Sequence, residues 1–86
     1  MARETYANAT TLSDPTIADT TLSAGIDAVT TSIPLTSLTN LPATAPFRIL
    51  IDDELILITV RAIPATGTRG VEGTTAAIHA SGADVF

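Results

Sequence analysis

The clearest pattern of apolar and polar residues lies in the middle of the chain, after Pro46. Residues 47–51 (FRILI) and 54–61 (ELILITVR) are largely apolar, and the acidic pair Asp52-Asp53 separates them. Two such runs joined by a short polar pair are typical of a β-hairpin. The pattern therefore predicts a central hairpin with a tight acidic turn.

The second strand of this hairpin differs from a strand on a half-solvated sheet. Residues 55–58 are consecutively apolar, whereas a strand with one wet face alternates apolar and polar residues. We expect both faces to be covered, the second by the amino-terminal arm or by a neighbouring subunit. The side chains expected in the core are Phe47, Ile49, Ile51, Leu55, Leu57, Val60 and Val85.

Weaker patterns flank the hairpin. Residues 21–24 and 32–36 are short strand candidates, and Pro34 favours a sheet edge for the second because proline lacks a ladder donor. Further along, the pattern predicts a third strand over residues 65–71, a single helical turn over 76–80 and a closing strand over 83–86. Residues 1–19 have no sustained period and contain Asp14-Pro15. We expect them to form an extended arm before a β domain of residues 20–86.

Composition agrees with an all-β chain. The 86 residues include 16 Thr and 9 Ile, whose β-branched side chains favour extended backbone. We therefore predict an all-β fold, a small β-sandwich or barrel-like domain with an extended amino-terminal arm. Only three residues are aromatic and none is cysteine, so the core is thin and has neither disulfide nor thiolate-bound zinc. Association with other chains is the expected source of further stability.

Charge narrows the classes of partner. The net charge is -5 and the chain has no lysine, which disfavours both a phosphate backbone and an anionic membrane surface. The longest apolar stretch, residues 49–60, contains three acidic residues and does not fit a transmembrane span. We expect no nucleic-acid or membrane partner, and a place in the cytosol or inside an assembly that leaves the cell.

Two polar features have a possible chemical role. Asp52, Asp53 and Glu54 could bind a hard cation such as Ca²⁺, but neighbouring strand positions point to opposite faces and a turn explains the two aspartates. His79 is the single histidine, and no nucleophile with an evident base accompanies it. A structural hydrogen bond from its imidazole to nearby backbone is therefore expected in preference to catalysis.

The glycine-rich residues 67–74 (GTRGVEGT) lack the lysine and the long following helix of a phosphate-binding loop. An ordinary loop is predicted, in which Arg69 and Glu72 pair locally across Gly70. The chain is thus expected to be non-enzymatic, with no cofactor and no metal. The residues expected to form structural turns are Asp52, Asp53, Arg69, Gly70, Gly73 and His79.

One resemblance goes beyond composition. Residues 45–54 (APFRILIDDE), Thr59-Val60 and residues 68–85 (TRGVEGTTAAIHASGADV) resemble a module of tailed-bacteriophage structural proteins, in which a PFRI-ID-E hairpin, an RG-x-x-GT turn and an H-A-x-G-A-x-V ending recur. It covers about half of the chain, and residues 21–37 match more weakly. It departs at residues 62–65, where a longer hairpin turn is expected.

The resemblance implies a virion structural protein, assembled in the host cytoplasm. We expect a capsid decoration or cement protein that binds and stabilises the shell of the major capsid protein, or contacts other virion proteins, with a homo-oligomeric body for which a trimer is favoured. Its arm would clamp adjacent capsid proteins by strand addition, so deletion of residues 1–19 should abolish attachment. The residues expected to make these partner contacts are Arg3, Tyr6, Leu12, Ile17 and Leu22.

Two alternatives remain open at this point. The same module could serve in the tail, as a neck, baseplate or fibre-associated component. A free cytosolic barrel could instead use Arg48, Arg61 or Arg69 to hold an anion.

Overall fold

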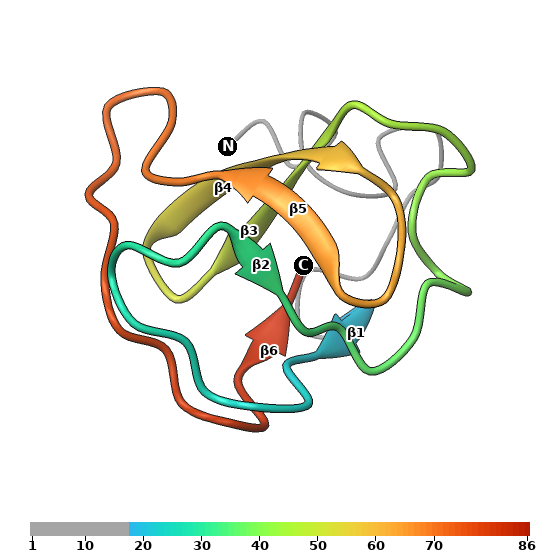
Figure 1. Cartoon of the computed structure of the whole chain (residues 1–86), viewed down its shortest axis with the longest axis horizontal. Coiled ribbons are helices and arrows are strands. Elements are labelled where there is room, and N and C mark those ends of the chain that lie inside the picture. Colours follow the sequence, from blue (N-terminus) through green and yellow to red (C-terminus); the bar gives the residue numbers. More distant parts are fainter. Residues whose placement is uncertain (1–17) are drawn as a thin grey trace.

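The computed structural model describes residues 18–86, and all regular structure in that part is β-strand (Figure 1). The strands are β1 (Thr20–Thr21), β2 (Ser32–Ile33), β3 (Phe47–Ile51), β4 (Glu54–Val60), β5 (Ala65–Thr68) and β6 (Asp84–Val85). The predicted all-β fold is confirmed. Residues 1–17 of the predicted arm lie outside the described part.

The six strands form one antiparallel sheet in the order β1-β6-β3-β4-β5-β2. The sheet curls so that its two outer strands approach each other, and backbone hydrogen bonds link the segments that follow them. The Ser23 amide donates to the Pro34 carbonyl at 2.8 Å, and the Thr36 amide donates to the Thr21 carbonyl at 2.9 Å. The fold is therefore the barrel-like form of the prediction, with β2 as an outer strand.

The predicted hairpin is β3 and β4, paired from Phe47 opposite Ile58 to Ile51 opposite Glu54. Asp52 begins its turn with φ 53, a left-handed conformation that Asp tolerates better than most residues. On β5, Gly67 packs against core side chains of β4, and a Cβ atom there would lie 2.7 Å from Ile56 Cγ2. Only glycine fits this position without displacing the core.

The core lies on the inner face of the curled sheet. Phe47, Ile49, Ile51 and Val85 are buried there as predicted, and Leu55 is also buried as predicted but outside this cluster. Other residues of β4 and of the segments around the hairpin complete the core. Those further core residues are Leu22, Ile26, Ile33, Leu35, Leu41, Ile56, Ile58 and Ala65.

Two core predictions on β4 are wrong. The inward-facing residues of this strand are Ile56 and Ile58, so Leu57 is only half-buried on the other face. An irregularity in the β4–β5 register falls between Ile58 and Val60, and Val60 is 50% exposed beyond it. Residues 55–58 are all apolar. The sequence therefore has no alternation of apolar and polar positions from which to predict which face each of these residues occupies.

Two other expectations need correction. Residues 76–80 form no helical turn, because His79 pairs with Ile26 through both backbone groups, at 2.9 and 3.0 Å. Leu22, expected to contact a partner, is 1% exposed and packs within the body's own core. β1 itself begins at Thr20, and the Asp19 amide already donates to the Val85 carbonyl. Arg3, Tyr6, Leu12 and Ile17 lie outside the described residues.

Candidate functional site

A buried carboxylate lies at the centre of a network of hydrogen bonds. Glu54, the first residue of β4, is 1% exposed, and a buried charge is costly unless it is paired and hydrogen-bonded. Its two oxygens accept five hydrogen bonds. The donors are Arg69 Nε (2.8 Å), Arg69 Nη2 (2.9 Å), the Gly70 amide (2.9 Å), the Ala77 amide (3.1 Å) and His79 Nε2 (2.7 Å).

Arg69 follows β5 directly and uses every donor of its guanidinium. Nε and one Nη2 hydrogen form a bidentate pair with Glu54, the strongest common geometry for such ions. Nη1 donates to the carbonyls of Asp27 (2.6 Å) and Thr30 (2.9 Å), and Nη2 also donates to the Ala77 carbonyl (2.6 Å). One buried cation thus joins the start of β4 to two loops that are far apart in sequence.

His79 completes the cluster from the other side. Its Nε2 lies 2.7 Å from Glu54 Oε1, and its Nδ1 lies 2.8 Å from Asp52 Oδ2. The His79 ring therefore bridges the two carboxylates, one through each of its nitrogens. The four residues Asp52, Glu54, Arg69 and His79 are hereafter the Glu54 cluster.

The loop after Arg69 has the backbone that the cluster needs. Gly70 has φ 57 while its amide donates to Glu54, and a Cβ there would lie 2.9 Å from the Ala76 amide nitrogen. Gly73 has φ 85, and Glu72 between them also has a positive φ, 57. The Thr74 hydroxyl accepts from the Leu55 amide at 3.0 Å and donates to the Val71 carbonyl at 2.8 Å. The loop is therefore fastened to the start of β4.

The surroundings of Glu54 hold it in the ionised form. Burial raises the pKa of its carboxyl, but hydrogen bonds from Arg69, His79, Ala77 and Gly70 outweigh burial and lower the pKa from 4.5 to about 2. A carboxylate that is ionised and fully bonded at neutral pH is a poor proton acceptor. The arrangement is suited to holding the two loops against the start of β4 rather than to acid–base chemistry.

Several sequence-based site predictions change in this light. Arg69 pairs with Glu54 rather than with Glu72, whose partner is Arg48. The His79 ring contacts two carboxylates rather than backbone, since those acceptors lie on both sides of it. Asp53 is exposed in the hairpin turn. Within residues 18–86, no group of three or more His, Cys, Asp or Glu side chains is placed to hold a metal ion.

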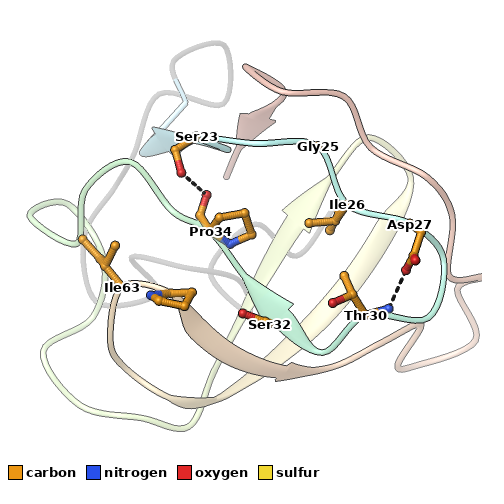
Figure 2. Close-up of a pocket in the computed structure, with 9 residues that line it drawn as sticks. Ser23, Gly25, Ile26, Asp27, Thr30, Ser32, Pro34 and Ile63 are labelled. Atoms are coloured by element: carbon orange, nitrogen blue, oxygen red, sulfur yellow. Dashed lines mark hydrogen bonds between the residues drawn. The ribbon is translucent and has the colours of Figure 1, made fainter.

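A groove of about 460 Å³ opens beside the cluster, between the segments 23–27 and 30–34 (Figure 2). Asp27 Oδ1 accepts from the amides of Val29 (2.9 Å) and Thr30 (2.7 Å), which shapes the loop at one end of the groove. These amides lower the pKa of Asp27. The lining residues are Ser23, Gly25, Ile26, Asp27, Thr30, Ser32, Pro34, Ile63 and Pro64. This lining includes neither histidine nor arginine.

The groove is therefore no anion site of the kind considered from the sequence. The three arginines of the described part have separate partners: Arg48 pairs with Glu72, Arg69 with Glu54, and Arg61 donates to the carbonyls of Pro42 (2.7 Å) and Leu38 (3.0 Å). The hypothesis that these guanidiniums converge on an anion is wrong. The same part of the chain contains no helix long and apolar enough to cross a membrane.

No family model matches this chain, and neither the curated proteins nor the solved structures provide a match. Function has to be inferred from its own residues.

The burial of Glu54 was missed in the sequence, where it was considered only as the first residue of a predicted strand and as a possible cation ligand. The next four residues of that strand are apolar. A carboxylate adjoining such a run is a candidate for burial and then needs a cationic partner. Arg69 and His79 were both candidates for that partner. Their separation from Glu54 along the chain gave no sign of the contact.

Proposed function

We propose that this chain is a non-enzymatic structural protein of a tailed-bacteriophage virion, a capsid decoration protein that binds and stabilises the shell of the major capsid protein. The observation that carries the non-enzymatic part is the saturation of the Glu54 cluster. All five guanidinium donors of Arg69 and both ring nitrogens of His79 are engaged within the protein. The groups best suited to chemistry are thus committed to holding loops in place.

The virion part of the proposal is supported by the sequence resemblance. The sequence motifs that carry the resemblance contain Glu54, Arg69, Gly70 and His79. These residues come from separate segments of the chain but contact one another around the buried Glu54 carboxylate. A motif whose residues fasten a fold, rather than build a reactive centre, is consistent with a module used for attachment. Binding is then the whole function, and repeated copies on a symmetric shell strengthen it through multivalency.

The copy number of the chain in gradient-purified particles tests this proposal. Quantitative mass spectrometry against the major capsid protein should give on the order of hundreds of copies per particle, because shell symmetry repeats each binding site many times. A few copies, in a multiple set by the tail, would favour a neck, baseplate or fibre-associated role instead. Absence from the particles would refute the virion proposal.

The amino-terminal arm stays a prediction, and a truncation tests it separately. Deletion of residues 1–17 keeps Asp19, whose amide bonds the Val85 carbonyl, so the body should still fold. We expect normal thermal unfolding of the truncated protein but loss of attachment to particles that lack the chain. Undiminished attachment would show that the body alone holds the shell.

A further inference from the structure

A slot between β6 and the segment 34–37 holds residues 20–23 (TTLS), which include β1 (Figure 1). On one side of this slot, hereafter the β1 slot, β1 pairs with β6. On the other side, Leu22 forms a bridge with Leu35. The two outer edges of the curled sheet meet here, so the occupant of the β1 slot closes the sheet.

Each of the four side chains makes a contact of its own in the β1 slot. The three hydroxyls form hydrogen bonds, and the leucine side chain is buried in the core. The contacts are Thr20 with the Ser37 amide (3.1 Å), Thr21 with the Thr36 hydroxyl (2.9 Å), Leu22 in the core at 1% exposed, and Ser23 with the Pro34 carbonyl (3.1 Å; Figure 2). A residue of another type would lose a hydrogen bond or a core side chain, so the slot favours the order Thr-Thr-Leu-Ser.

The same four residues occur a second time in the chain, at 10–13, ten positions earlier. Residues 10–13 lie outside the described part. Their side chains are the same four in the same order, so they can offer the β1 slot every side-chain contact that residues 20–23 make. Ala9 also has a backbone amide in the position of the Asp19 amide, which donates to the Val85 carbonyl. The chain therefore contains two segments that fit one slot.

The connection to the next paired residue decides which copy is favoured. Ile26 is held by His79, and two residues join it to the copy at 20–23. With the earlier copy in the slot, residues 14–25 would make this connection, twelve residues that begin with the turn-forming pair Asp14-Pro15. The longer loop costs more entropy to close, but this cost grows only slowly with length. The copy next to Ile26 is thus the main occupant, and the earlier copy is a competitor within reach.

We propose that residues 10–13 are a second occupant of the β1 slot, which they enter when residues 20–23 leave it. The exchange shifts the chain by ten residues. It shortens the segment ahead of the slot from 19 residues to 9 and turns residues 14–25 into a loop, so the reach of the amino-terminal arm has two values. The inference does not depend on the proposed function, because no virion partner takes part in the exchange.

A double-mutant cycle in the full chain tests the exchange. Leu22→Asn places a polar side chain in the core and disfavours the usual occupant, whereas Leu12→Asn alone should leave urea unfolding unchanged. In the Leu22→Asn background, Leu12→Asn should raise the equilibrium constant of unfolding by about tenfold, because it removes the remaining leucine that fits the slot. If Leu22→Asn leaves too little folded protein, Leu22→Ala gives the same comparison.

Leu41 provides the matched control for this cycle. Its side chain is 5% exposed in the same core but lies outside the β1 slot, so the earlier copy cannot replace it. Leu12→Asn should therefore have no effect in the Leu41→Asn or Leu41→Ala background. An effect of equal size there would show that Leu12 stabilises the fold by a route other than the slot, and the inference would fall.

Disulfide trapping detects the exchanged pairing directly, because the chain has no cysteine of its own. The Thr21 and Thr36 hydroxyls are 2.9 Å apart, so Thr11→Cys combined with Thr36→Cys should form an intrachain disulfide when the exchange occurs. Ala7→Cys and Thr16→Cys, each combined with Thr36→Cys, are controls whose register does not match. We expect a several-fold higher yield for Thr11→Cys than for either control.

Each outcome of these experiments decides for or against the exchange. Coupling of Leu12 with Leu22, together with preferential intrachain crosslinking at residue 11, would establish it within one chain. Equal crosslinking at the three arm positions, or no effect of Leu12→Asn in the Leu22→Asn background, would overturn it. Disulfide-linked dimers in place of the intrachain product would assign the slot to the arm of a second copy and would also overturn the inference.

Discussion

Acid should destabilise this protein mainly through Glu54. Its pKa is lowered from 4.5 to about 2 in the folded state, and a folded-state pKa below the unfolded value contributes stability that is present above pH 4.5. The contribution is lost as the pH falls through 4.5 toward 2, where the carboxyl becomes protonated in the folded state as well. The size of the shift corresponds to about 3 kcal/mol, or about 10 to 20 °C in the midpoint of thermal unfolding of a domain of this size.

Urea denaturation at a series of pH values between 2 and 7 measures this loss. Glu54→Gln should be about 3 to 5 kcal/mol less stable at pH 7, because Arg69 and His79 lose an ionised partner in a buried site. Its stability should then fall much less than that of the wild type between pH 4.5 and 2. Glu72→Gln is the control, since it removes an exposed carboxylate whose ion pair with Arg48 is worth about 1 kcal/mol or less.

Parallel pH profiles for the wild type and Glu54→Gln would refute this account of acid sensitivity. If Glu54→Gln does not fold, carboxyl ¹³C NMR of the wild type gives the same information. The Glu54 signal should titrate near pH 2, and a midpoint near 4.5 would contradict the argument.

Three further predictions concern the body of the fold. Gly67→Ala should cost about 1 to 3 kcal/mol because the new Cβ would lie 2.7 Å from Ile56 Cγ2; urea denaturation measures this, and Thr66→Ala at the exposed neighbouring position is the control. Ile49→Ala should cost about 2 to 5 kcal/mol and the half-buried Leu57→Ala less; equal losses by the same measurement would contradict the assigned register. Arg69→Lys should destabilise the fold and raise amide hydrogen exchange in the loop 27–30, because an ammonium has three donors where the guanidinium uses five; unchanged exchange would count against that role.

The hairpin and the strand content could be predicted because their signals are local. The apolar runs on either side of Asp52-Asp53 specify β3 and β4 directly, and Pro34 correctly indicated an outer strand. The register of β4 could not be predicted, because residues 55–58 are all apolar and carry no alternation. The exposure of the Val60 side chain depends on an irregularity in the β4–β5 pairing, which the pattern of side chains does not indicate.

The Glu54 cluster could be predicted only in part. Glycines at residues 70 and 73 indicated a turn, and they do adopt positive φ. The partners of Arg69 and His79 could not be found from spacing, since Glu72 is nearer to Arg69 in sequence but Glu54 is the residue that the sheet brings beside it. Asp27 and Thr30 contribute backbone carbonyls, and backbone contacts leave no mark on residue type.

The order of the strands in the sheet also has a consequence for the route by which the chain folds. β3, β4 and β5 form a continuous meander over residues 47–68, whose contacts close only short loops, whereas β1 pairs with β6 across almost the whole described chain. Long loops close more slowly than short ones. We therefore expect the meander to be the nucleus of the folding transition state, and β1, β6 and the loop 27–30 to join it later. Arg69 would then find its last carbonyl partners only when the chain has nearly finished folding.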